Sequence, residues 1–296
     1  MENSISTRIA ADLEFSGAVA QSRYAICGQY QIHYSEWGDI DAPVLLMWHG
    51  LARTGRDFDV LAGRLAAHWR VICPDTIGRG LSQWAADPAR DYAMARYVEV
   101  AAQLLDGLGV RRLVWLGTSM GGAIGMQCAA TVLRERIDAL VVNDIGPELP
   151  AAAVARIVRY AGDPPTFARA TELEDWLRLA YRPYGWLSDA QWRAMAETSL
   201  RRLPDGRVTL HYDPAIVRQL AERPEDYTQW SAYDSLRQPL LLLRGAESDL
   251  LTEDIARAMQ QRGPRAQRID FAGCGHAPAL NVEAQMRVIA RFLGTP

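Results

Sequence analysis

The feature that most constrains the fold is the sequence Gly117-Thr118-Ser119-Met120-Gly121 together with its flanks. The apolar run before it, residues 113–116, predicts a strand, and the small residues after it predict a helix. A side chain at 117 or 121 would collide with the neighbouring strand or helix, so both positions require glycine. Ser119 then lies on a sharp, strained turn that exposes its hydroxyl at a helix N-terminus. This Gly-X-Ser-X-Gly nucleophile elbow predicts Ser119 as a catalytic nucleophile.

Strands and helices alternate along the chain on both sides of this turn. From residue 44 to residue 142, continuous apolar runs alternate with helical patterns, which favours a mostly parallel sheet with helices on both faces. Two strands at 23–27 and 31–37 precede this part and form an expected antiparallel pair. From 147 to 233 the patterns are helical, with a tight turn at 203–206 and no convincing buried strand.

These patterns predict one catalytic domain with an insert. We expect a loosely held N-terminal extension at residues 1–20 and a core formed by residues 21–146 and 234–296. Residues 147–233 would form a helical cap between the sixth and seventh units of the sheet. The chain has 296 residues, which is long enough for one large α/β domain with such an insert.

Composition and charge narrow the classes of partner. The formal net charge is −3, and no basic run exceeds a pair, so we expect no nucleic-acid partner. No apolar stretch approaches the ~20 residues of a membrane helix, and the first residues do not resemble a secretory signal. The four cysteines show no metal-binding spacing. We therefore expect a cytoplasmic protein that acts on a small molecule without a metal, a cofactor or a membrane.

A serine nucleophile needs a base, and His276 is the best of five histidines. It lies in the glycine-rich loop 273–278, between the last strand and the last helix, where the loops of a parallel sheet form sites. His33, His68 and His211 lie in the peripheral hairpin, at a helix end and in the insert. These three are more simply surface or packing residues.

His49 also follows a strand, at the edge of the expected site. Its predicted role is structural, because hydrogen bonds from its ring would hold the backbone of Gly50 and Leu51. The backbone N–H of Leu51 would then pair with that of Met120 to form an oxyanion hole.

Two aspartates could orient the base. Asp144 follows the sixth strand and Asp249 follows the seventh, and the order serine, aspartate, histidine accepts either. We favour Asp249, since Leu250 and Leu251 would anchor its loop and Thr252 could cap the next helix. Asp144 would then support the start of the insert.

The loop 74–82 contains two charged residues, Asp75 and Arg79. They could be misread as a site that binds a substrate carboxylate. We expect instead that they organise the loop through hydrogen bonds from side chain to backbone.

The motifs together resemble the α/β-hydrolase fold superfamily, in its capped branch of carboxylesterases, enol-lactonases, carbon–carbon bond hydrolases and cofactor-free haloperoxidases. The matching segments run in family order over about 44–292: His49-Gly50, Asp75 to Ser82, Gly117 to Gly122, Ser248-Asp249 and Gly275 to Pro278. The resemblance implies an α/β fold with a mostly parallel eight-stranded sheet and a helical cap after strand 6. It also implies a triad of Ser119, Asp249 and His276, with oxyanion donors at Leu51 and Met120. Branches with an aspartate nucleophile are excluded by Ser119.

The predicted activity is hydrolysis of a small or medium ester, lactone or thioester through an acyl-enzyme on Ser119. Two alternatives stay open: hydrolysis of a carbon–carbon bond in a diketone-like substrate, and a small-molecule receptor that retains the triad. The insert is rich in large aromatic side chains, which suggests an apolar or aromatic acyl substrate. These are Trp176, Trp186, Trp192, Trp230, Tyr160, Tyr181, Tyr184, Tyr212 and Tyr227.

Overall fold

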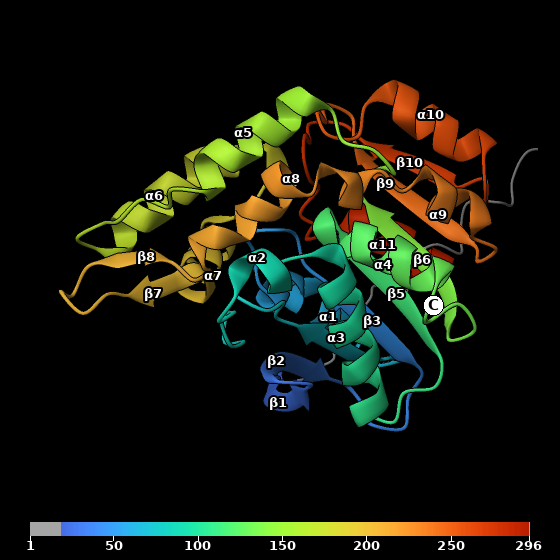
Figure 1. Ribbon diagram of the computed structural model, residues 1–296, viewed down its shortest axis with the longest axis horizontal. Helices are drawn as coiled ribbons and strands as arrows, with labels where there is room; N and C mark the ends of the chain where they lie inside the picture. Colours follow the sequence, from blue (N-terminus) through green and yellow to red (C-terminus); the bar gives the residue numbers. More distant parts are fainter. Residues whose placement is uncertain (1–18, 296) are drawn as a thin grey trace, which may run out of the picture.

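The computed structural model describes residues 19–295. The N-terminal extension predicted at residues 1–20 therefore lies almost wholly outside the described residues. Over the described part, eight strands form one sheet in the order β1-β2-β4-β3-β5-β6-β9-β10 (Figure 1). Its strands are β1 (Gln21–Cys27), β2 (Tyr30–Trp37), β3 (Val44–Trp48), β4 (Arg70–Pro74), β5 (Leu113–Thr118), β6 (Ile137–Asn143), β9 (Leu240–Gly245) and β10 (Gln267–Phe271).

The sheet is mostly parallel, as the alternation of strands and helices predicts. β2 runs antiparallel to both of its neighbours, β1 and β4, while the other neighbouring pairs from β4 to β10 are parallel. The predicted antiparallel pair at the start of the chain is therefore confirmed. Parallel strands carry their C-terminal ends to the same edge, so the loops after β3, β5, β6, β9 and β10 meet there.

Helices cover the two faces of the sheet. The α-helices of the core are α1 (Asp59–Leu65), α2 (Pro88–Asp91), α3 (Met94–Gly107), α4 (Met120–Ala130), α10 (Glu253–Gln261) and α11 (Glu283–Phe292). Buried side chains of α3, α4 and α10 belong to one apolar cluster, and those of α1 and α11 to a second.

The strands divide their side chains between these two clusters. In β3, Leu46 and Trp48 belong to the first cluster, whereas Leu45 and Met47 belong to the second. Successive residues of a strand point to opposite faces, so a continuous apolar run can fill both cores. The unbroken apolar runs of the sequence have this physical cause.

The insert between β6 and β9 contains helices and one small hairpin. Its α-helices are α5 (Ala151–Ala161), α6 (Ala170–Ala180), α7 (Asp189–Ser199), α8 (Arg218–Glu222) and α9 (Trp230–Ser235), and its hairpin is β7 (Leu200–Arg202) with β8 (Val208–Leu210). Three short 3-10 helices of the described chain also lie in the insert, at Arg182–Tyr184, Pro214–Val217 and Pro224–Tyr227, and one lies in the core, at Gly55–Phe58. Figure 1 shows α5, α6, α7 and the hairpin grouped at one side of the molecule.

The hairpin corrects the prediction that residues 147–233 hold no buried strand. Val208, Thr209 and Leu210 are buried, and β8 pairs with β7 in antiparallel register. Strands of three residues are too short to show a period of two, so the sequence pattern could not reveal them. The tight turn predicted at 203–206 is confirmed, because Gly206 N–H donates to Leu203 O at 3.0 Å.

No helix among residues 19–295 is long and apolar enough to cross a bilayer.

Candidate active site

Ser119 lies between β5 and α4 with φ 53° and ψ −122°. A positive φ is strained for a residue with a side chain, and such strain concentrates at functional sites. The flanking glycines make the turn possible. A Cβ on Gly117 would lie 2.2 Å from Gly121 O, and a Cβ on Gly121 would lie 2.0 Å from Trp48 O. The strand, strained serine and helix predicted from the sequence are therefore present.

Two stacked indole rings support this turn. Trp48 and Trp115 lie parallel, with ring centroids 5.2 Å apart, and both side chains are fully buried. Trp115 Nε1–H donates to Gly121 O at 3.0 Å, which fixes the first turn of α4 against β5. The two buried indole rings therefore pack against the strained turn and support its backbone.

The structure brings Ser119 and His276 together as predicted. The Ser119 hydroxyl lies 2.9 Å from His276 Nε2, and His276 Nδ1 lies 2.8 Å from Asp144 Oδ2. A carboxylate only accepts hydrogen bonds, so Nδ1 carries the proton and Nε2 accepts from the serine. Three segments far apart in sequence, the loops after β5, β6 and β10, form one hydrogen-bonded chain.

The prediction that Asp249 orients His276 is wrong in this geometry. Asp249 is 52% exposed and forms an ion pair with Arg156, with an Nε–Oδ2 distance of 2.7 Å. Asp144 is fully buried and contacts the imidazole instead. Both aspartates follow neighbouring strands, β6 and β9, so loop position alone could not separate them.

The local reasons for favouring Asp249 hold, although the conclusion drawn from them does not. Leu250 and Leu251 are buried, and Thr252 Oγ1 accepts from Ile255 N–H at the start of α10. The same turn, however, directs Ser248 toward the site and Asp249 toward solvent. A side chain's direction within a tight turn depends on the packing around the turn, and the sequence pattern does not contain that information.

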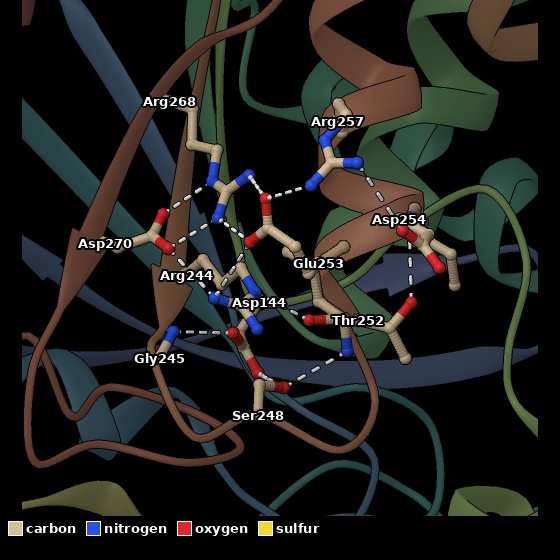
Figure 2. Close-up of polar contacts among 12 residues, drawn as sticks. Asp144, Arg244, Gly245, Ser248, Thr252, Glu253, Asp254, Arg257, Arg268 and Asp270 are labelled. Carbon is tan, nitrogen blue, oxygen red and sulfur yellow. Dashed lines mark hydrogen bonds and ion pairs between the residues drawn. The ribbon is translucent and has the colours of Figure 1, made fainter.

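Three donors surround the Asp144 carboxylate. Gly245 N–H donates to Oδ1 at 2.8 Å and the Ser248 hydroxyl donates to Oδ2 at 2.6 Å (Figure 2). His276 Nδ1–H also donates to Oδ2. Such bonds offset the cost of burying a charge. Sequence reasoning gave Ser248 no role of its own, although it stands beside Asp249 in the motif.

An ion-pair network holds the turn that carries Ser248. Arg244 of β9 donates to Leu251 O at 2.8 Å and to Asp270 of β10 at 2.9 Å. Figure 2 shows Arg268 and Glu253 continuing this network from β10 to α10. Hydrogen bonds from Arg268 hold the pKa of the Asp270 carboxyl below its usual value. The network therefore ties β9, β10 and α10 together behind Asp144.

His49 holds the loop after β3, as predicted. Its Nδ1–H donates to Gly50 O at 2.6 Å, and its Nε2 accepts from Thr76 N–H at 2.9 Å. Burial lowers the pKa of His49 to about 4, so the ring is neutral near pH 7. A neutral ring with one donor and one acceptor fits these two partners.

Asp75 and Arg79 organise the neighbouring loops, as expected. Asp75 accepts from the backbone N–H groups of Gly55 and Leu81, at 2.8 and 2.9 Å. Arg79 is fully buried and donates to Leu51 O at 2.8 Å. The peptide groups around Gly50 and Leu51 are therefore held by both His49 and Arg79.

A small cavity of about 40 Å³ lies at Ser119 and His276. Gly50 and Leu51 line it, and Met120 is the first residue of α4, so its N–H has no carbonyl one turn earlier to bond. The cavity is also lined by three aromatic residues of the insert and by two arginines: Tyr160, Tyr181, Tyr184, Arg53 and Arg156. A second cavity, of about 170 Å³, shares Thr118 and Tyr184 as walls.

The other aromatic residues of the insert do not line the Ser119 cavity. Trp192, Tyr212 and Tyr227 are buried in packing, whereas Trp186 is 69% exposed. Sequence reasoning also missed Arg53 and Arg156, because no spacing relates the loop after β3 to the middle of α5. Among residues 19–295, no group of three or more His, Cys, Asp or Glu side chains could hold a metal ion.

A second Ser–His–Asp chain lies outside this site. The Ser22 hydroxyl donates to His33 Nε2 at 2.9 Å, and His33 Nδ1 lies 2.8 Å from Asp75 Oδ2. His33 is buried, which agrees with its predicted packing role, while Ser22 is exposed on β1.

Comparisons with known proteins agree with this architecture. The family model of the alpha/beta hydrolase fold matches residues 43–281. The 3-hydroxybutyrate-oligomer hydrolase of Cupriavidus necator is 37% identical over 275 residues, which cover 90% of this chain and 93% of that protein. A pimeloyl-[acyl-carrier protein] methyl ester esterase of Xanthomonas oryzae pv. oryzae is 29% identical over 262 residues, covering 86% of this chain and 96% of that protein.

Solved structures show the same relationship. An alpha/beta hydrolase from Novosphingobium aromaticivorans is 34% identical with a TM-score of 0.82, covering 93% of this chain and 98% of that one. A putative hydrolase from Rickettsia typhi is 27% identical with a TM-score of 0.85, covering 93% and 99%. The family match extends over most of the chain, including β3 and the loops that carry Ser119, Asp144 and His276. The chain therefore belongs to the α/β-hydrolase fold family.

Proposed function

We propose that this protein hydrolyses carboxylic esters through an acyl-enzyme on Ser119. The observation that carries the proposal is the hydrogen-bonded chain from Ser119 through His276 to Asp144, with its serine at the N-terminus of α4. A serine hydroxyl is a weak nucleophile, and a neutral imidazole held in the correct tautomer is the base that activates it.

The reaction follows from these positions. His276 Nε2 takes the hydroxyl proton as Ser119 Oγ attacks the ester carbonyl, and the resulting imidazolium then protonates the departing alkoxide. In the second half, His276 takes a proton from water, the hydroxide attacks the acyl carbon, and Ser119 leaves and regains its proton. Asp144 holds the ring and stabilises its positive charge throughout.

The backbone N–H groups of Leu51 and Met120 are the proposed oxyanion hole. The cavity position of Leu51, its anchoring by Arg79, and the place of Met120 at the start of α4 support this assignment. Each such donor contributes about 10²–10³ in turnover in enzymes of this type. The insert 147–233 would act as the cap, since Arg156, Tyr160, Tyr181 and Tyr184 come from it and line the cavity.

Short hydroxyacyl esters are the substrate class that we propose. The relative from Cupriavidus necator, at 37% identity over most of both chains, is named for 3-hydroxybutyrate oligomers. The cavity at Ser119 is small, about 40 Å³, which favours short acyl units over long chains. The tyrosine walls fit the apolar face of such units, as expected for an apolar acyl compound.

Turnover tests the proposal. We expect the linear 3-hydroxybutyrate dimer and p-nitrophenyl acetate to be hydrolysed with many turnovers, and the Ser119→Ala protein to hydrolyse neither. Acyl chain length, aryl esters and lactones would be varied beside these. A single burst with an activated ester and no further turnover would contradict an enzyme and favour a receptor. Selective cleavage of a diketone-like substrate would move the activity to carbon–carbon hydrolysis.

A further inference from the structure

The cavity at Ser119 is lined by basic residues and by no acidic ones. Two arginines line it, Arg53 from the loop after β3 and Arg156 from α5, while the described lining residues include no Asp or Glu. The carboxylates that pair with these arginines, Asp57 and Asp249, lie outside the lining. A ligand in the cavity is therefore bounded by two arginines and by neither of their acidic partners.

Arg53 is a fixed cation. Its side chain is 3% exposed, its Nε donates to Asp57 at 2.9 Å, and its Nη1 donates to Ser199 at 2.9 Å. The guanidinium also lies over the Tyr181 ring, 4.9 Å from the centroid. Burial by itself would lower the pKa of Arg53, but Asp57 outweighs it and raises the pKa, so the charge persists.

Arg156 is held much more loosely. Its side chain is 42% exposed and its partner Asp249 is 52% exposed, with Nε–Oδ2 at 2.7 Å and Nη2–Oδ1 at 2.8 Å. Exposed ion pairs contribute little to stability, so a second carboxylate can compete for this guanidinium. Among the contacts of residues 19–295, none occupies Arg156 Nη1, which leaves one edge of the fork open.

We propose that Arg156 binds a free carboxylate on the substrate, so that the enzyme selects anionic esters over neutral ones. Arginine binds carboxylates in a planar, two-point geometry, and water screens the attraction less inside a cavity that Tyr160 and Tyr184 also line. Arg53 adds a fixed positive potential beside it. The inference rests on the proposed function, because it assigns the carboxylate end of an ester that Ser119 attacks.

A linear 3-hydroxybutyrate dimer and its methyl ester form a matched pair of probes. They share the internal ester bond and differ in the charge of one end. Binding to the Ser119→Ala protein, measured by titration calorimetry, separates recognition from turnover. We expect the free acid to bind at least about tenfold more tightly than the methyl ester.

Two further substitutions in the Ser119→Ala background show whether Arg156 binds the substrate or only holds α5 to the loop after β9. Arg156→Gln and Asp249→Asn both break the ion pair between α5 and the loop after β9. We expect Arg156→Gln to reduce the preference for the acid about tenfold or more, and Asp249→Asn to keep or increase it.

The proposal is overturned if the Ser119→Ala protein shows no preference for the free acid over the methyl ester. It is also overturned if adding Arg156→Gln changes that preference by less than about threefold. It is equally overturned if Asp249→Asn lowers the preference as far as Arg156→Gln does. The proposed hydrolysis fails separately, when the protein with Ser119 intact binds the dimer and does not turn it over.

Discussion

Two Ser–His–Asp chains with the same internal distances lie in this molecule. In one, Ser119, His276 and Asp144 are linked by contacts of 2.9 and 2.8 Å; in the other, Ser22, His33 and Asp75 are linked by contacts of the same two lengths. Both aspartates are buried, and both accept further hydrogen bonds. Side-chain geometry alone therefore does not distinguish them.

The backbone under each serine differs. Ser119 has a positive φ at the start of α4, an eleven-residue helix whose first N–H groups are available to an anion. Ser22 lies within the extended edge strand β1, and its backbone is in register with Ser35 of β2. Asp75 also accepts from Gly55 and Leu81, so its chain ties β1, β2 and two loops together. The two serines therefore differ in the backbone donors available to a developing oxyanion, which is why we propose Ser119, and not Ser22, as the nucleophile.

The largest expected effect separates the two serines. Ser119→Ala should lower kcat for an ester by roughly 10⁴-fold or more, whereas Ser22→Ala should change it by no more than about twofold. Steady-state hydrolysis of p-nitrophenyl acetate measures both. A phosphonate reagent followed by peptide mapping gives an independent reading, with the label expected on Ser119. Labelling of Ser22 in the Ser119→Ala protein would show that the second serine is reactive too, against this expectation.

The next largest effect separates the aspartates. Asp144→Asn should lower kcat by about 10³–10⁴-fold, because the amide no longer holds the productive imidazole tautomer. Asp249→Asn should keep the kcat for a neutral ester within about threefold, since its side chain forms an exposed ion pair. The reverse result would return the acid to the loop after β9.

Replacing Asp75 should affect stability more than chemistry. Asp75→Asn places an amide against His33 and removes a buried charge with several donors, which should lower the free energy of unfolding by about 3 kcal/mol. Urea unfolding followed by circular dichroism measures this loss. Turnover per folded molecule should fall far less in Asp75→Asn than in Asp144→Asn. An equal fall would mean that Asp75 also contributes to catalysis.

The pH dependence of stability tests the protonation of His49, a buried residue hydrogen-bonded to Gly50 and Thr76. Its pKa is lowered from 6.5 to about 4 by burial, so the unfolded chain binds more protons than the folded one in that interval. The free energy of unfolding should therefore fall as the pH drops from 6.5 toward 4, with a His49 contribution of roughly 3 kcal/mol.

His49→Gln is the matched variant for this measurement, because glutamine does not titrate in the interval. His211 also has a pKa lowered by burial and remains in both proteins, so the difference between their unfolding curves isolates His49. Parallel pH profiles for the two proteins would mean that His49 does not titrate as its burial requires.

The smallest effect concerns the support of Asp144. Ser248→Ala removes the hydroxyl that donates to Oδ2 at 2.6 Å and should lower kcat about tenfold. Ser248→Thr, which retains the hydroxyl, should restore most of the activity. No recovery in that variant would assign the loss to packing.

Much of the site could be predicted because its parts are encoded locally. The strand before Ser119, the glycines at 117 and 121 and the helix after them lie within a dozen consecutive residues. His276 was recognisable from its loop after the last strand. The hairpin β7–β8 could not be predicted in this way, since strands of three residues have no resolvable period.

Local patterns along the chain were enough to predict the α/β architecture, the strained turn at Ser119 and the loop that carries His276. The choice between Asp144 and Asp249 depends instead on how distant segments pack. Their strands are neighbours, and the buried turn that anchors Leu250 and Leu251 directs Ser248 inward and Asp249 toward Arg156. The presence of two arginines at the cavity has the same cause, since Arg53 and Arg156 line one cavity only when the insert packs over the loop after β3.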